Sequence, residues 1–190
     1  MKKLLKEIAQ CEICKAHLPL GPKPILRVSK NTKILIIGQA PGTKAHESGK
    51  DFYDASGKKL RSWLGVDEAT FYNTEYIGVM PMGFCYPGKG KTGDLPPRPE
   101  CKPQWHQNIL DELTAVELII LVGQHAQKAY LGKQFQRNLT ETVKNYHTFL
   151  PKLFPIPHPS PTNRFWLAKN KWFENEVVPM LKTRIQEVLK

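Results

Sequence analysis

The sequence predicts an α/β protein in which helices cover both faces of a central, mostly parallel four-stranded sheet. The first observation is that four short apolar segments alternate with amphipathic segments of helical period, as expected for strand–helix–strand units. The second is the length of 190 residues, which suits one domain, residues 1–190, with one main core. The third is that polar, glycine- or proline-containing motifs follow three of the four predicted strands.

The predicted strands are continuous apolar runs. Lys33–Gly38 reads KILIIG, and a run without polar alternation that ends in glycine is typical of a strand buried on both faces. The same reasoning predicts three further strands, namely Tyr76–Met80, Glu117–Gly123 and Lys152–Ile156.

The helical pattern lies between and around these strands. We expect helices over residues 2–10, Cys101–Leu113, Gln124–Leu131 and Trp166–Lys190, the last with a possible break at Pro179. A further helix is expected to begin at an N-cap, Ser56, and to carry Leu60, Trp63 and Leu64. Residues 18–24 are too rich in proline for regular structure. Two long loops, Pro41–Ala55 and Gly83–Glu100, are predicted, and loops of that length are usually functional.

The charge balance favours a polyanionic partner. The net charge is +11 and the sequence pI is about 9.5, although a well-solvated basic surface explains the charge equally well. No segment approaches the roughly 18 apolar residues of a membrane span. The N-terminus lacks the apolar core of a secretion signal. We therefore expect a cytoplasmic, monomeric protein with no membrane partner.

Polar motifs cluster at the predicted carboxyl ends of the strands. They are Gly38-Gln39-Ala40-Pro41-Gly42, Gly123-Gln124-His125 and His158-Pro159-Ser160-Pro161. Because open α/β sheets bind ligands beyond this edge, we expect the three motifs to share one site.

The four cysteines form two pairs with metal-ligand character. Cys11 and Cys14 are a C-x2-C pair, and Cys85 and Cys101 flank a loop rich in proline and glycine. Zinc and an iron–sulfur cluster both accept four thiolates, and buried thiols without metal remain an equal alternative on spacing alone.

Taken together, these motifs resemble the uracil-DNA glycosylase superfamily, and most closely its thermostable iron–sulfur class. The resemblance rests on the C-x2-C pair, the Gly38–Gly42 turn, the G-x-x-F-x-x-x-G-like stretch Gly49–Gly57, the C-x15-C pair and His158-Pro159. It covers about residues 11–165. The motif HPSP-x-N at residues 158–163 is more similar to the single-strand-selective class. The resemblance implies a 4Fe-4S cluster on Cys11, Cys14, Cys85 and Cys101, with zinc as the alternative.

A glycosylase needs a donor for the departing base, an aromatic platform, and a group that orients water. His158 is the candidate donor, with a structural role in capping the adjacent backbone as the alternative. Phe52 is the candidate platform and Tyr53 its rival, although a loop aromatic is also often a buried anchor.

The third requirement is where the chain departs from its relatives. The iron–sulfur class has Glu at position 39 and the best-known uracil glycosylases have Asp at position 40, whereas this chain has Gln39 and Ala40. An amide can position water but cannot take its proton. Asp54 is our first candidate for the missing charge, ahead of Glu47 and Asp51, and a helix N-terminal charge is an equally good explanation of Asp54.

Base selection and DNA contacts complete the set of expectations. The Asn that reads uracil in relatives is absent from Gly78–Gly83, so another deaminated or damaged base is possible. Phosphate contacts are expected near Gly42 and Ser160, with Asn163, Arg164 and Phe165 in the segment where relatives place a wedge. Lys58, Lys59 and Arg61 form either a backbone-tracking or a merely solvated helix face.

The sequence therefore predicts a DNA glycosylase that removes a flipped-out deaminated or damaged base from DNA. A non-catalytic or covalently trapping binder of damaged DNA is the first alternative, because the motif carboxylate is missing. An enzyme that acts on free nucleosides is the second.

Overall fold

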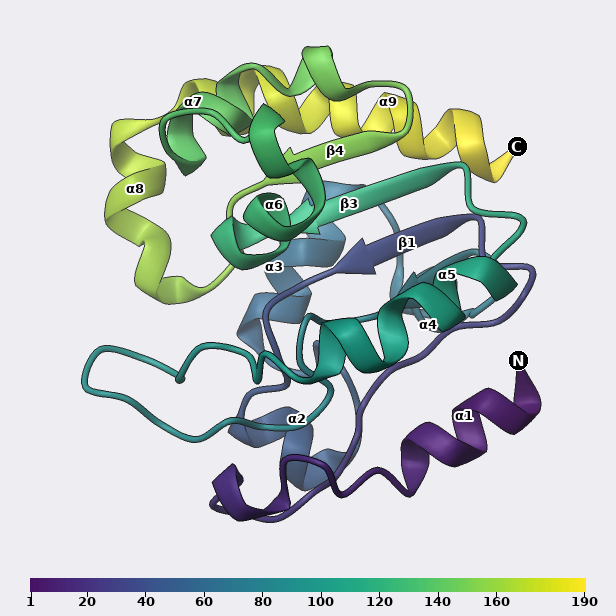
Figure 1. Ribbon diagram of the computed structural model, residues 1–190. Coiled ribbons are helices and arrows are strands. Elements are labelled where there is room, and N and C mark those ends of the chain that lie inside the picture. The colour runs from purple at the N-terminus through teal and green to yellow at the C-terminus, as the bar shows by residue number, and fades with distance from the viewer.

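The computed structural model describes all residues, 1–190, and contains a four-stranded, fully parallel sheet with the order β2-β1-β3-β4 (Figure 1). The strands are β1 (Ile34–Ile37), β2 (Ile77–Val79), β3 (Leu118–Val122) and β4 (Leu153–Ile156). Each lies within a predicted strand, and β1, β2 and β3 are buried at every residue. The fully parallel sheet confirms the predicted α/β class. Its strands are apolar throughout because both faces of the sheet are covered.

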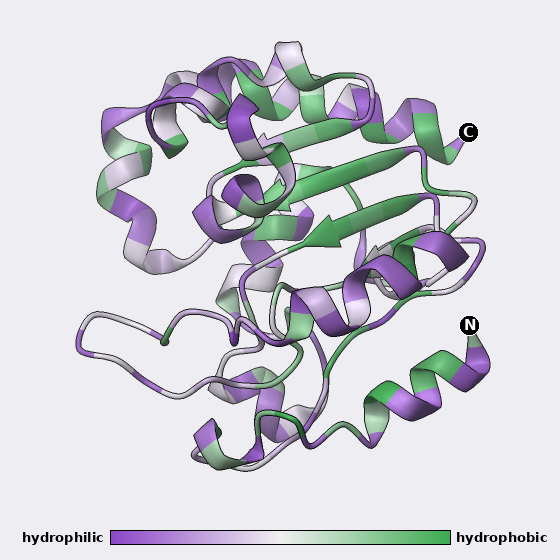
Figure 2. Cartoon of the chain, viewed as in Figure 1, coloured by the Kyte–Doolittle hydropathy of each residue, from purple (hydrophilic) through white to green (hydrophobic).

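Helices form a layer on each face of the sheet (Figure 1). On one face Ile34, Ile36 and Ile120 pack against one core cluster, and on the other Leu35, Ile37 and Ile119 pack against a second. The first layer contains α3 (Ala55–Leu64), α4 (Glu68–Tyr72) and α9 (Val178–Leu189), and the second contains α1 (Lys2–Ala9), α5 (Gln107–Glu112) and α6 (Gly123–Leu131). Figure 2 shows apolar strands between helices in which polar and apolar residues alternate.

Three short helices were not predicted: α2 (Thr43–Ser48), α4 and α7 (Leu139–Lys144). The expectation of a structureless Pro41–Ala55 loop was therefore wrong, because α2 occupies its middle. Helices of five or six residues contain too few turns for an apolar period to be visible in the sequence. No helix is long and apolar enough to cross a bilayer.

Two predicted helix features differ in the structure. The N-cap of α3 is Asp54, whose Oδ1 accepts the Gly57 N–H at 3.1 Å, and Ser56 lies inside the helix. The C-terminal helical region is broken at Asn170, between α8 (Arg164–Lys169) and a π-helical turn (Phe173–Val177) that leads into α9. Pro179 lies in the first turn of α9 and does not break it.

Candidate active site

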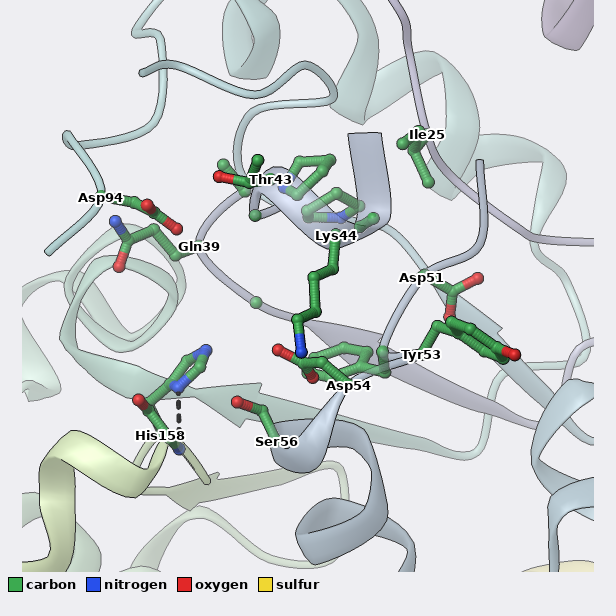
Figure 3. Close-up of a pocket in the computed structure, with 18 of the residues that line it drawn as sticks. Ile25, Gln39, Thr43, Lys44, Asp51, Tyr53, Asp54, Ser56, Asp94 and His158 are labelled. Atoms are coloured by element: carbon green, nitrogen blue, oxygen red, sulfur yellow. Dashed lines mark hydrogen bonds between the residues drawn. The ribbon is translucent and has the colours of Figure 1, made fainter. Parts of the chain in front are cut away.

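The turn after β1 and the turn after β4 line one cavity of about 380 Å³ at the carboxyl edge of the sheet (Figure 3). Backbone hydrogen bonds hold the first turn: the N–H groups of Met82 and Gly83 donate to the carbonyls of Gly38 and Gln39 at 2.8 and 3.0 Å. His158 faces this turn from across the cavity. The arrangement follows from parallel topology, which brings the carboxyl ends of neighbouring strands to one edge.

His158 has a defined tautomer. Its Nδ1 accepts the backbone N–H of Ser160 at 3.2 Å (Figure 3), so the ring proton of the neutral imidazole lies on Nε2. Burial lowers the pKa of His158, with the nearby Asp54 charge opposing that shift. The backbone-capping contact weighed in the sequence is therefore present, and it leaves Nε2–H as the group available to a ligand.

Phe52 reaches the cavity from a strained backbone. Its φ is +48°, an unusual value for a bulky residue. Its carbonyl accepts from Arg61 Nη1 at 3.2 Å and from the Tyr72 hydroxyl at 3.3 Å. A Cβ placed on Gly57 would lie 1.6 Å from the same carbonyl oxygen, so only glycine fits there. The ring packs edge-on against Phe71 and its tip faces Gly38.

The next residue, Tyr53, also lines the cavity but is 59% exposed, so it forms the rim rather than the inner wall.

Three carboxylates line the cavity, and two of them are already engaged. Asp51 is paired with Arg27 through two contacts of 3.0 Å, from Nε to Oδ1 and from Nη2 to Oδ2. Asp54 caps α3 as described. Asp94, which the sequence reasoning missed, comes from the Gly83–Glu100 loop, and its carboxylate is affected by burial and nearby charges without a hydrogen bond from the protein. Glu47, the remaining sequence candidate, is exposed on α2 and does not line the cavity.

The remaining cavity wall contains both predicted and unpredicted residues. Ala40, Pro41 and Gly42 line it as expected. Lys44 of α2 (Figure 3) and Lys89 add positive charge that was not predicted. The signal for Asp94 was present in the sequence, since it is the only acidic residue between Cys85 and Glu100.

A larger groove of about 910 Å³ adjoins the cavity. The two share six lining residues, so the groove opens directly into the cavity; they are Gln39, Ala40, Lys89, Asp94, His158 and Ser160. The groove continues along Gln124 and His125 on one side and the Lys89–Gly93 loop on the other. The third sequence motif therefore belongs to the groove, next to the cavity of the other two.

The predicted DNA-contact residues have different local roles. Asn163 Nδ2 donates to the His158 carbonyl at 2.7 Å, and Ser160 Oγ contacts Thr162 Oγ1 at 2.8 Å, so both side chains stabilise the turn. Arg164 lies over the ring of Phe165 with its guanidinium 4.8 Å from the ring centre. Phe165 is 67% exposed, the most exposed of the large apolar side chains.

The four cysteines meet away from this site. All four thiols are free and line one narrow cavity with Phe84, Arg98 and Trp105. Burial raises the pKa values of Cys14 and Cys85 to about 11. No group of three or more Cys, His, Asp or Glu side chains is placed to hold a metal ion. The two pairs, although far apart in sequence, are thus brought together by the fold without forming a single-ion site.

Residues 27–182 match the family model described as the uracil DNA glycosylase superfamily. The chain belongs to that superfamily. It also shares 16% identity, at a TM-score of 0.47, with a solution NMR structure described as "a putative Uracil DNA glycosylase from Methanosarcina acetivorans", over 83% of this chain and 93% of that one. Membership of the superfamily rests on the family model, since similarity at that level carries no functional information.

Proposed function

We propose that this superfamily member is a DNA glycosylase that hydrolyses the N-glycosidic bond of uracil or a related deaminated base. The observation that carries the proposal is His158, whose Nε2–H is held toward a cavity of a volume usual for small-ligand sites. An enzyme that acts on a base in DNA must first extrude it from the stack. The cavity provides a place for such a base beside Phe52 and the Gly38–Gly42 turn.

The chemistry follows from where charge develops. As the bond breaks, the base acquires negative charge and the sugar becomes cation-like. A neutral imidazole that donates Nε2–H to a base oxygen stabilises that anion without carrying charge itself. The lowered pKa of His158 keeps the ring neutral at physiological pH. Phe52 supplies the face on which the base stacks.

The groove provides a path for the strand on either side of the extruded base. Lys89 and Lys91 stand on its loop side, and the chain's net charge is +11. Arg164 and the exposed Phe165, just beyond the His-Pro turn, are suited to filling the gap that the base leaves.

A base-release screen tests the proposal. Single- and double-stranded oligonucleotides that contain uracil, hypoxanthine and other modified bases are incubated with the protein, and abasic sites are detected by alkaline cleavage. We expect release from at least one uracil- or hypoxanthine-containing strand. Salt-sensitive binding without release, or a DNA adduct that survives a denaturing gel, would instead support the binding or trapping alternative. Cleavage of free nucleosides but not of oligonucleotides would favour a nucleoside hydrolase.

We also propose that the four cysteines hold a 4Fe-4S cluster. The supporting observation is that four free thiols, from segments 70 residues apart, line one mostly apolar cavity. A polynuclear cluster joins its thiolates through several irons, so the four sulfurs need not converge on a single ion. The cluster would tie the N-terminal segment to the end of the Gly83–Glu100 loop, and no step of the hydrolysis requires it.

Its test is spectroscopic. Protein purified under mild conditions should be brown with absorbance at about 400 nm, and Cys85→Ser should abolish both properties. Cys85→Ser is compared with a substitution of the exposed Ser62, Ser62→Ala, which should leave the spectrum unchanged. A colourless protein that contains one zinc per chain would contradict the cluster.

A further inference from the structure

The Gly83–Glu100 loop contains a small hairpin that forms one wall of the active-site cavity. Gly88 and Leu95 are joined by a backbone hydrogen bond of 2.9 Å, from the Leu95 N–H to the Gly88 carbonyl, and Lys89 and Asp94 form an antiparallel bridge. Both bridge residues line the cavity and the groove. The hairpin therefore stands where the two spaces meet, and Asp94 is its only carboxylate.

Gln39 holds this hairpin against the sheet. Its side-chain Nε2 donates to the Leu95 carbonyl at 3.0 Å, one residue beyond Asp94, while its backbone carbonyl accepts from Gly83. Figure 3 shows Gln39 and Asp94 side by side on the same rim of the cavity. A glutamate at position 39 has no N–H to give to a carbonyl. In the sequence, Gln39 appears only as the loss of a catalytic carboxylate. In the structure, its side-chain amide makes a contact that a carboxylate could not make.

The Asp94 carboxylate is the one unengaged acid in the cavity. Arg27 occupies both oxygens of Asp51, and one oxygen of Asp54 caps α3, whereas no hydrogen bond from the protein reaches the Asp94 carboxylate. Asp94 Oδ2 lies 3.3 Å from where a Cβ on Gly42 would be, so a side chain at position 42 would crowd the carboxylate.

The charged surroundings of Asp94 suit a proton acceptor. Partial desolvation raises the pKa of Asp94, the Asp54 charge adds to the shift, and Lys89 opposes it. The other ionisable side chains that line the cavity are Lys44, Asp51, Tyr53 and His158. A carboxyl group with a raised pKa is a better general base than an ordinary one, because proton affinity assists the transfer.

We propose that Asp94, positioned by Gln39, is the carboxylate that binds the attacking water and accepts its proton. The inference rests on the proposed glycosylase function. The C1′–N bond breaks and its electron pair stays with the base, whose anion His158 stabilises and solvent later protonates. The water oxygen forms the new bond to C1′, and its proton passes to Asp94, which releases it to solvent. Asp94 thereby takes over the role that residue 39 or 40 has in relatives.

The principal test is Asp94→Asn in single-turnover base release. We expect a rate about 100-fold lower, within the range for loss of a general base, with oligonucleotide affinity within twofold of the wild type. Asp111→Asn, the same change at an exposed position of α5, should leave both quantities unaltered. Asp94→Asn within threefold of the wild-type rate would overturn the inference, while the release by wild type would still support the glycosylase. A wild type that releases no base would overturn both.

Chemical rescue distinguishes a catalytic from a structural loss. Asp94→Ala should recover at least fivefold in rate with added formate, which supplies a carboxylate to the vacated position. The same formate should not accelerate Gln39→Leu, because the Asp94 carboxylate is still present in that variant, although displaced.

Hydrogen exchange provides an independent readout for Gln39. In Gln39→Leu and Gln39→Glu, the amides of residues 88–95 should exchange faster while those of β1 and β3 do not, and base release should fall about tenfold. Unchanged exchange in the hairpin would contradict the positioning role of Gln39. Asp94→Ala without formate rescue would contradict the catalytic role of Asp94.

Discussion

The two walls of the cavity are built in different ways. One wall, the sheet wall, consists of the Gly38–Gly42 turn and His158, which follow directly from β1 and β4; backbone N–H groups hold both, and the nearby Asn163 amide adds one contact to the His158 carbonyl. The other, the loop wall, consists of Phe52, Asp54 and Asp94, and side chains from elsewhere hold it in place. The proposed donor to the departing base therefore has a rigid support, whereas the proposed platform and water site depend on a few replaceable contacts.

His158→Ala tests the sheet wall and should have the largest effect. Loss of a preorganised donor to a developing anion typically lowers a rate about 10²–10³-fold, and we expect that loss in single-turnover base release. His147→Ala removes an exposed histidine and serves as the control. A loss below tenfold would mean that His158 is not the main donor.

Gly57→Ala tests the loop wall without touching the chemistry directly. The new methyl would overlap the Phe52 carbonyl, so the Phe52 turn must move. A displacement of about 1 Å can cost about 100-fold in rate, and we expect a loss of that order in kcat/KM. Ser62→Ala, on the exposed side of the same helix, is the control. Full activity of Gly57→Ala would show that the position of Phe52 is unimportant.

Asp51→Asn measures how strongly the loop wall is attached. The Arg27–Asp51 pair is largely buried, and Arg27 also stacks on Phe71 and Tyr72. Removing one partner of such a pair should lower the free energy of unfolding by about 2 kcal/mol in urea denaturation, below the figure for a fully buried pair because some solvent remains. Glu187→Gln, which breaks an exposed pair with Arg184, should change it by less than about 0.5 kcal/mol.

The smallest expected effect is on the pH dependence of the free energy of unfolding, through His106, which lies behind the Gly83–Glu100 loop. His106 stacks on Phe84 at the start of the Gly83–Glu100 loop, and burial lowers its pKa to about 4. Between the ordinary pKa of 6.5 and that value, the unfolded chain binds a proton that the folded chain excludes, so stability falls as pH falls. We expect a loss of about 1 kcal/mol from pH 6.5 to 5.5.

His106→Gln should have a shallower pH dependence over the same interval, measured by urea denaturation. His17→Gln, at an exposed position, should behave like the wild type. Equal slopes for all three proteins would mean that His106 is not excluded from protonation by the fold.

The difference between the walls also explains what the sequence could predict. Buried parallel strands are continuous apolar runs, so all four strands and the sites that follow them were visible, His158 and Gly38–Gly42 included. The loop wall depends on contacts across long intervals of sequence. Gln39 bonds Leu95 fifty-six residues away, and no local pattern records that contact. The role of Gln39 was therefore missed, and Asp94 was overlooked although it is the only acidic residue between Cys85 and Glu100. The helix N-terminal position of Asp54, in contrast, was weighed in the sequence and is present in the structure.

The His-Pro turn determines which residues are tolerated at position 160. Pro159 and Pro161 have no amide hydrogen, so within the turn only residue 160 can donate to His158 from the main chain. The placement of the imidazole proton thus depends on a peptide group and not on the serine hydroxyl. Nineteen of the twenty genetically encoded residues could stand at position 160 and still supply that amide, while a third consecutive proline would leave the ring free to adopt either protonation pattern.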